Sequence, residues 1–156
     1  NIGNLPGLVS KLKALGANGV VLFNRFYQLD IDINKMEITS GTVFSNPGDF
    51  HNTLRWTAIV SGKVSDIDIA CSTGVHSWED PIKGILAGAS TIQLCSVLYE
   101  QGMDIVGNML TCMEEWMGQN NFESIKEFSG KLDYSNIDSP ALYERVQFMK
   151  YFSSYK

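Results

Sequence analysis

The sequence has 156 residues, of which 44% are hydrophobic and 19% are charged, and these proportions are typical of a soluble globular domain with its own core. The net charge of -5 excludes the broad basic surface that nucleic-acid binding requires. No charged-then-apolar leader and no apolar run long enough to span a bilayer are present, so we expect no membrane partner. The three cysteines form no CxxC pair, which favours a reducing, cytoplasmic location over a disulfide scaffold.

The first forty residues predict a helix, a strand and a hairpin. Apolar residues recur at helical spacing over residues 5–15, with Asn4 as the N-cap and Pro6 in the first turn. Residues 20–23 form a short, continuous apolar run, which is typical of a strand buried on both faces. Alternating apolar and polar residues over 31–38 indicate an antiparallel hairpin with one solvent-exposed face.

The middle of the chain predicts a helix, a second strand and a third helix. The helix is expected over residues 49–61 and the buried strand over residues 67–71. Ser77 and Asp80 match a capping box at the start of the next helix, and Gly88 suits the position just after its end.

A third buried strand is expected over residues 91–95, and a long amphipathic helix from about Gly102. Strands separated by helices imply a parallel sheet, so the predicted class is α/β. Three strands supply less than half of a (β/α)8 TIM barrel; a small open doubly wound sheet is the alternative. We expect residues 1–132 to form the barrel part and residues 133–156 a tail that packs on the barrel or on a partner. Because the sequence begins at Asn1, not Met, we expect it to belong to a longer protein.

Polar residues follow each of the three predicted strands. They are Asn24-Arg25, Ser72-Thr73-Gly74 and Cys95-Ser96. Ligands of parallel α/β folds bind where the carboxyl ends of the strands meet, and a barrel phosphate commonly lies between the loops after its last two strands. A glycine among hydroxyl residues suits the approach of a phosphate to backbone N–H groups. The alternative is that Ser-Thr-Gly is only a tight strand-to-helix turn.

The order of these segments resembles the class 1 dihydroorotate dehydrogenases over residues 4–132. That family has a sixth strand ending in Asn, an antiparallel insertion, a seventh strand ending in a Gly-rich turn, and a last strand before a long helix. The most specific matches are Leu86-Ala87-Gly88-Ala89-Ser90-Thr91-Ile92-Gln93 and Phe128-Ser129-Gly130-Lys131-Leu132. The resemblance implies the C-terminal portion of an FMN-binding TIM barrel, with about three barrel strands, one hairpin insertion and flanking helices.

The resemblance also implies cofactor-binding residues. Gly74 matches a glycine whose N–H meets the FMN phosphate, with Ser72 and Thr73 beside it. Cys95 and Ser96 match a Gly-Thr pair that holds the same phosphate from the last strand. A cysteine in place of that glycine is a departure from the family pattern.

For the substrate, Asn24 matches an asparagine that contacts the pyrimidine ring. Arg25 replaces a Ser or Thr and suits an anionic substrate through a bidentate pair; a surface or salt-bridged arginine is the equal alternative. The family's catalytic base and flavin-side lysine lie on earlier strands, so no catalytic residue and no activity are expected in this chain alone. The implied function is oxidation of dihydroorotate or a related ring through FMN in pyrimidine biosynthesis.

Two other classes of function remain open: a non-catalytic α/β binding or assembly domain, and another phosphate-binding barrel enzyme. A Ser72, His76 and Asp80 triad is disfavoured because these residues are too close in sequence and Asp80 is better used as a cap. His51 has no second ligand at metal spacing, so no metal is expected. Apolar strand edges of an incomplete barrel predict a homo-oligomer or association with the rest of the barrel.

Overall fold

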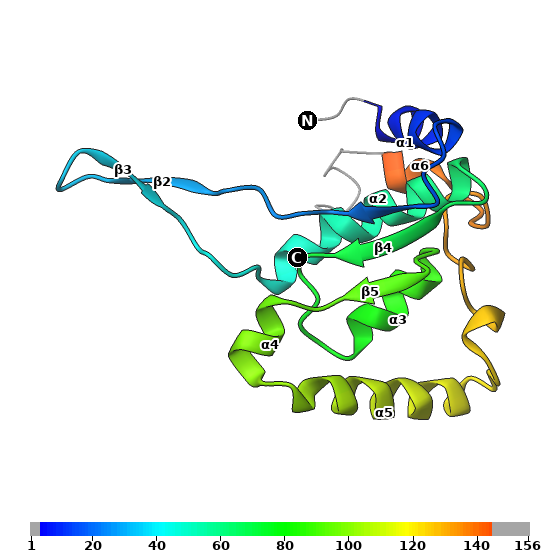
Figure 1. Ribbon diagram of the computed structural model, residues 1–156. Helices are drawn as coiled ribbons and strands as arrows, with labels where there is room; N and C mark the ends of the chain where they lie inside the picture. The colour runs from blue at the N-terminus through cyan, green and yellow to red at the C-terminus, as the bar shows by residue number, and fades with distance from the viewer. Residues whose placement is uncertain (1–3, 145–156) are drawn as a thin grey trace, which may run out of the picture.

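The computed structural model describes residues 4–144 and shows an α/β fold built on a three-stranded parallel sheet (Figure 1). The sheet order is β1-β4-β5, with β1 at Gly19–Leu22, β4 at Asp68–Ser72 and β5 at Thr91–Gln93. Between β1 and β4 lies an antiparallel hairpin of β2 (Leu29–Asp32) and β3 (Glu37–Ser40). The helices are α1 (Leu5–Ala14), α2 (Phe50–Lys63), α3 (Glu79–Leu86), α4 (Ser96–Gln101), α5 (Asp104–Gln119) and α6 (Ala141–Glu144), with 3-10 turns at Pro47–Asp49 and Ile125–Glu127.

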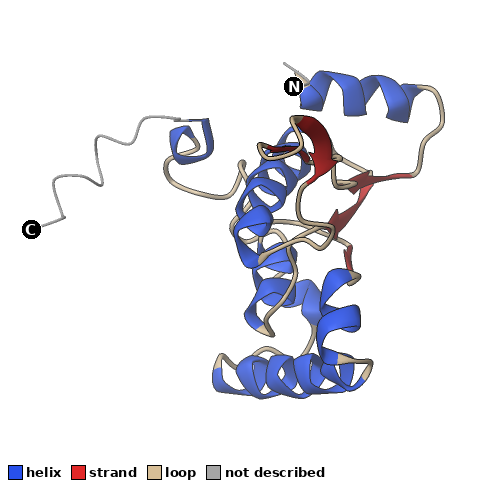
Figure 2. Cartoon of the chain, turned by 90° about the vertical axis from the view of Figure 1, so that its left-hand side faces the viewer, coloured by secondary structure: helices blue, strands red, loops and turns tan. Residues whose placement is uncertain are grey.

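The element order makes the sheet parallel. Helix α3 connects β4 to β5, and the hairpin and α2 connect β1 to β4. Each connection returns the chain to the end of the sheet where the previous strand began, so the strands are parallel. All three strands run toward the side where the hairpin leaves and α4 begins (Figure 1). In the view turned by 90°, the short strands lie in the middle of the fold and the long helix α5 crosses below them (Figure 2). The architecture is that of a partial TIM barrel, as the sequence predicts.

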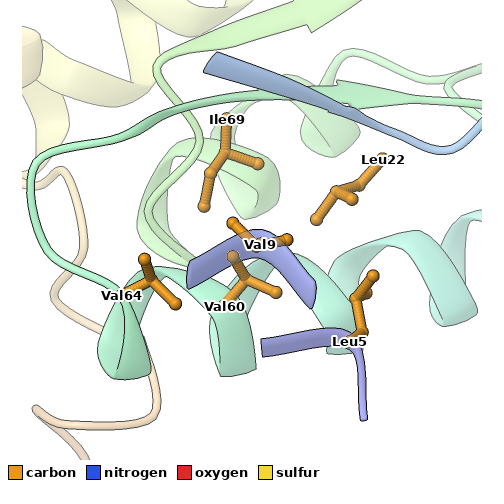
Figure 3. Close-up of a cluster of buried hydrophobic side chains, with 6 residues drawn as sticks. All are labelled: Leu5, Val9, Leu22, Val60, Val64 and Ile69. Carbon is orange, nitrogen blue, oxygen red and sulfur yellow. The ribbon is translucent and has the colours of Figure 1, made fainter. Parts of the chain in front are cut away.

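The helices bury one face of the sheet. Side chains of α1 and α2 meet Leu22 of β1 and Ile69 of β4 in a cluster with little solvent exposure (Figure 3). Asn4 caps α1 as expected, because its side-chain oxygen accepts from the Gly7 amide at 2.9 Å. Burial of these aliphatic side chains, each worth about 1.5–3 kcal/mol, holds the strands in register.

The expectation that the strands are buried on both faces is wrong for β1 and β5. Val21 of β1 is 52% exposed, and Thr91 and Gln93 of β5 are exposed. Only one face of this sheet is covered by helices in the described part of the chain. Periodicity could not detect this, since a continuous apolar run is the same whether its second face meets helices or further strands.

The hairpin was expected to have one solvent-exposed face, but both of its faces are exposed. β2 and β3 project as an arm away from the sheet (Figure 1). The opposed pair Ile31 and Ile38 is exposed together with the polar pair Asp30 and Thr39 on the other face. The alternation of residues therefore predicts the strand pairing correctly and the burial incorrectly.

Two helix starts differ from the expectation. The Asp80 carboxylate accepts from the Ser77 amide at 3.0 Å, but α3 begins at Glu79 and no side chain caps it, so only half of the expected capping box forms. Helix α4 begins at Ser96, three residues after the end of β5, and the residue pattern predicts no helix there. Gly88 follows α3 with φ of +99°, as expected for a glycine just beyond a helix end.

The described part of the tail packs on α2. The Tyr134 amide donates to the Ala58 carbonyl at 3.0 Å, and Lys63 pairs with Glu144 at 2.9 Å. The tail aromatics Phe148, Tyr151 and Phe152, whose packing on the barrel or a partner the sequence predicts, lie outside the described residues.

Candidate functional site

The carboxyl ends of β1, β4 and β5 surround one cavity of about 490 Å³. Its lining includes all seven residues that the sequence singles out, which are Asn24, Arg25, Ser72, Thr73, Gly74, Cys95 and Ser96. The turns after β4 and β5, which are about twenty residues apart in the chain, therefore meet at a common hollow as their parallel pairing requires. A neighbouring cavity of about 540 Å³ shares Asn24, Arg25 and Thr73 with the first.

The turn after β4 has an unusual backbone. Thr73 and Gly74 both have positive φ, +80° and +86°, which is a strained conformation for a β-branched residue. The Thr73 hydroxyl donates to the Phe23 carbonyl at 2.8 Å, and the Phe23 amide donates to the Ser72 carbonyl at 3.0 Å. These bonds between the ends of β1 and β4 hold the turn in its strained form.

Several residues that line the cavity have unpaired backbone amides in the described part of the chain. Within residues 4–144, the amides of Thr73, Gly74 and Val75 have no acceptor, and neither do the amides of Cys95 and Ser96. Polar backbone groups in a folded protein ordinarily find a partner in the protein, in water or in a ligand. A set of neutral N–H donors joined by serine hydroxyls fits a phosphate or another oxyanion.

Arg25 is a salt-bridged arginine, which is the second of the two roles that the sequence allows for it. Its Nε lies 3.7 Å from Asp49 Oδ2, its Nη1 donates to the carbonyls of Thr42 and Val43 at 2.5 Å each, and its Nη2 donates to Thr42 Oγ1 at 2.8 Å. Both side chains of the ion pair are largely buried, at 17% and 25% exposed. The guanidinium is thus engaged by the chain itself.

A hydrogen-bonded network that sequence reasoning missed lies on the α4 side of the cavity. Ser45 donates from its amide to Ser96 Oγ at 2.9 Å, and the two hydroxyl oxygens lie 3.0 Å apart. Ser45 Oγ also lies 3.2 Å from Nε2 of the His76 ring. The other ring nitrogen, Nδ1, lies 3.3 Å from a carboxylate oxygen of Glu100. No local signal marks these residues, because the partners are separated by up to 51 positions in the chain.

The disfavoured triad of Ser72, His76 and Asp80 does not form. The His76 ring bonds to Ser45 and Glu100, while its backbone amide donates to Asp80 Oδ2 at 3.0 Å. Asp80 serves as a cap for the loop that follows Gly74. It accepts from two successive amides and pairs with Lys83 at 3.1 Å.

Asp80 is expected to stabilise the fold in a pH-dependent way. Burial alone would raise the pKa of its carboxyl, but two amide hydrogen bonds and the ammonium of Lys83 outweigh burial and hold the pKa below its ordinary value. Because the folded-state pKa is the lower one, the stabilisation is complete above the unfolded pKa and disappears as pH falls through the folded pKa. We expect Asp80→Ala to lower the free energy of unfolding by about 2 kcal/mol at neutral pH.

Urea denaturation of both proteins at several pH values checks this. The difference between wild type and Asp80→Ala should shrink below about pH 4. Asp104→Ala is a matched control, since Asp104 occupies the first turn of α5 but is exposed, and its loss should cost less than about 1 kcal/mol. A difference that persisted unchanged at pH 2 would contradict a role for the charged carboxylate.

The cysteines of β4 and the cavity differ in environment. Cys71 is fully buried behind the sheet, and this desolvation raises the pKa of its thiol to about 11. Cys95 is exposed at the cavity. All three cysteines are free thiols. A thiol reagent can therefore distinguish Cys95 from Cys71.

Comparison with known proteins identifies the relatives. The chain is 30% identical over 133 residues to the catalytic subunit of dihydroorotate dehydrogenase B (NAD(+)) from Pyrococcus horikoshii, an alignment covering 83% of this chain and 44% of that protein. The corresponding subunit of Pyrococcus furiosus is 30% identical over 73% of this chain and 39% of its own length. Over most of its own length the chain is therefore similar to these dihydroorotate dehydrogenase subunits. It is also 26% identical to the NAD-dependent dihydropyrimidine dehydrogenase subunit PreA of Escherichia coli K12, over 83% of this chain and 34% of that subunit.

The chain spans less than half the length of each of these relatives. This agrees with three strands of a barrel that needs eight. No protein-family model matches the chain. Within residues 4–144, none of the helices combines the length and the apolar character that crossing a bilayer requires.

Proposed function

We propose that the complete protein is an FMN-dependent oxidoreductase of the dihydroorotate dehydrogenase-like kind, and that this chain holds the phosphate end of the cofactor. One observation carries the proposal: the turns at Gly74 and Ser96 meet Asn24 around a single cavity in a chain related to dihydroorotate and dihydropyrimidine dehydrogenases. The lining is made of the donors that a phosphate monoester needs. Its position at the carboxyl ends of the last strands suits a barrel phosphate site.

In this proposal the amides of Gly74 and Ser96 donate to the phosphate from two sides. Ser72 and Thr73 shape the first turn. Because the Thr73 hydroxyl donates to the Phe23 carbonyl, Thr73 contributes to the site through its backbone amide. Cys95 takes the place of a glycine; its backbone amide remains a donor, and its exposed side chain borders the cavity. Bound FMN would accept a hydride from a reduced ring substrate, and the protein supplies position and electrostatics.

Asn24 is the residue of this chain that we propose contacts the ring substrate. It is exposed at the mouth shared by the two cavities, and its amide can both donate to and accept from a pyrimidine-like ring. The bond oxidised would be a CH–CH bond of dihydroorotate or a related ring, in pyrimidine metabolism. Because the base and the lysine of such enzymes lie on earlier strands, we expect this chain alone to be inactive.

The uncovered face of the sheet is the surface that we propose associates with the rest of the barrel or with another subunit. The face includes Val21 of β1, which is 52% exposed, and Ala70 of β4, next to a shallow hollow. Within the described residues β1 and β5 are the edge strands of the sheet, and unpaired strand edges can pair with further strands. The free thiols suit the reducing conditions of a cytoplasmic location, which is also part of the proposal.

Flavin binding by the full-length protein tests the proposal. We expect the purified protein to carry flavin absorbance, and the apoprotein to bind FMN at least tenfold more tightly than riboflavin, which lacks the phosphate. FMN should also protect Cys95 from a thiol reagent, with buried Cys71 unreactive in both states. A colourless protein that takes up no FMN, or one that binds a phosphosugar instead, would refute the flavoenzyme proposal and favour the alternative functions.

A further inference from the structure

Residues 42–46, which lead from the hairpin back to α2, form a strap along one side of the cavity. Val43, Phe44 and Ser45 of the strap line the cavity together with the turns after β4 and β5. The ring of Phe44 stacks on Tyr99 of α4, with centroids 5.4 Å apart and planes inclined by 27°. The strap therefore connects the end of the hairpin with α4 along the edge of the cavity.

Arg25 holds the first part of the strap. Its two Nη atoms donate to three oxygens of Thr42 and Val43, at 2.5 to 2.8 Å. Asp49 lies beside the same guanidinium and also accepts from the Asn46 amide at 3.0 Å, so one carboxylate connects Arg25 with the far end of the strap. Three of the five guanidinium N–H donors are occupied in this way, and Nε, 3.7 Å from Asp49 Oδ2, makes no hydrogen bond within the described residues.

Ser45 holds the middle of the strap to Ser96. The Ser45 amide donates to Ser96 Oγ, and the Ser45 hydroxyl lies within hydrogen-bond distance of both Ser96 Oγ and His76 Nε2. Ser45 is 8% exposed, and the His76 side chain is 8% exposed. Since Ser96 Oγ accepts from Ser45, its own O–H proton remains available to donate to an anion in the cavity.

We propose that Arg25 and Ser45 are positioning residues that hold the strap against Ser96, so that the Ser96 hydroxyl and the neighbouring amides are ordered for a phosphate before it binds. Arg25 then makes no contact with the ring substrate, and it acts on the phosphate end of the site through the strap. Donors ordered in advance bind an anion without the loss of conformational entropy on binding. This inference rests on the proposed function, because the phosphate in question is that of FMN.

Flavin affinity of the full-length apoprotein tests the inference through the fluorescence quenching of FMN and riboflavin. We expect Ser45→Ala and Arg25→Gln each to weaken FMN binding about tenfold or more and to leave riboflavin binding unchanged. Unchanged riboflavin affinity shows that each variant is folded. Ser45→Thr, which restores the hydroxyl, should recover most of the FMN affinity. Arg25→Lys should behave like Arg25→Gln, because one ammonium cannot reach three oxygens in a fork.

Lys35→Gln is the matched control, as it removes one positive charge from the exposed hairpin end. It should leave the affinities for FMN and riboflavin unchanged. If Arg25→Gln kept its FMN affinity and raised the KM of the ring substrate, Arg25 would be a substrate contact and the inference would be wrong. Wild-type protein that bound no FMN would overturn the proposed function itself, whereas wild-type binding with unaffected strap variants would overturn only this inference.

Discussion

Gly74→Ala is expected to destabilise the protein by about 3 kcal/mol or more. A Cβ at this position would lie 2.2 Å from the Phe50 backbone nitrogen and 2.6 Å from the Phe50 Cα, distances that no backbone-to-side-chain contact tolerates. The φ of +86° adds conformational strain for any residue with a side chain. The start of α2 must therefore shift away from the turn. FMN affinity should also fall, because the backbone amides of the Gly74 turn are displaced.

Gly16→Ala provides a control for the backbone strain alone. Gly16 lies just beyond the end of α1 and also has a positive φ, +99°, but a Cβ there would have no neighbour within 4 Å. We expect a loss of only about 1–2 kcal/mol. Urea denaturation of the full-length protein measures both variants. Equal losses for the two alanines would show that the approach of Phe50 to Gly74 is not the constraint at this turn.

Phe128→Ala is expected to lower the free energy of unfolding by about 3–5 kcal/mol. The Phe128 side chain is 0% exposed. The centroid of its ring lies 5.2 Å from that of Trp116, in an edge-to-face arrangement, and 5.3 Å from that of Phe122. The same cluster includes Ile85 and Met113. Truncation of the Phe128 side chain leaves a cavity between α3 and α5, and the neighbouring rings of Trp116 and Phe122 cannot readily move to fill it.

The matched control for Phe128 is Leu132→Ala in the same segment. Leu132 is 49% exposed, so its truncation should cost only about 1 kcal/mol. Both variants lie outside the lining of the proposed FMN cavity and should bind FMN normally at temperatures where they remain folded. A small effect of Phe128→Ala on the unfolding midpoint, equal to that of Leu132→Ala, would contradict the structural role of this ring.

The buried ring of Phe128 belongs to a segment that packs on α3. The segment Phe128 to Leu132 contributes packing and backbone hydrogen bonds to α3, such as Gly130 N to Ile85 O at 2.9 Å and Leu132 N to Leu86 O at 2.8 Å. It contributes no residue to the cavity. The segment that the sequence matches to the dihydroorotate dehydrogenases thus stabilises the fold, whereas the turns after the strands form the proposed site.

Features that depend on neighbours in the chain could be predicted from the sequence. The cap at Asn4, the glycine that ends α3 and the strand pairing of the hairpin all follow from residues a few positions apart. The position of Asn24, Gly74 and Ser96 at a common edge also followed, because parallel strands bring their carboxyl ends together whatever their sequence. These local rules were enough to identify the α/β class and the place of the candidate site.

The tertiary structure alone decided what the side chains at that edge contact. Arg25 could bind a ligand or a carboxylate of the chain, and only the fold placed Asp49 and residues 42–43 within its reach. The bond between Ser45 and Ser96 joins residues 51 positions apart, a contact that no periodicity encodes. Whether a strand face is covered depended in the same way on distant segments, since hydrophobic burial is a property of the assembled surfaces rather than of the residue order.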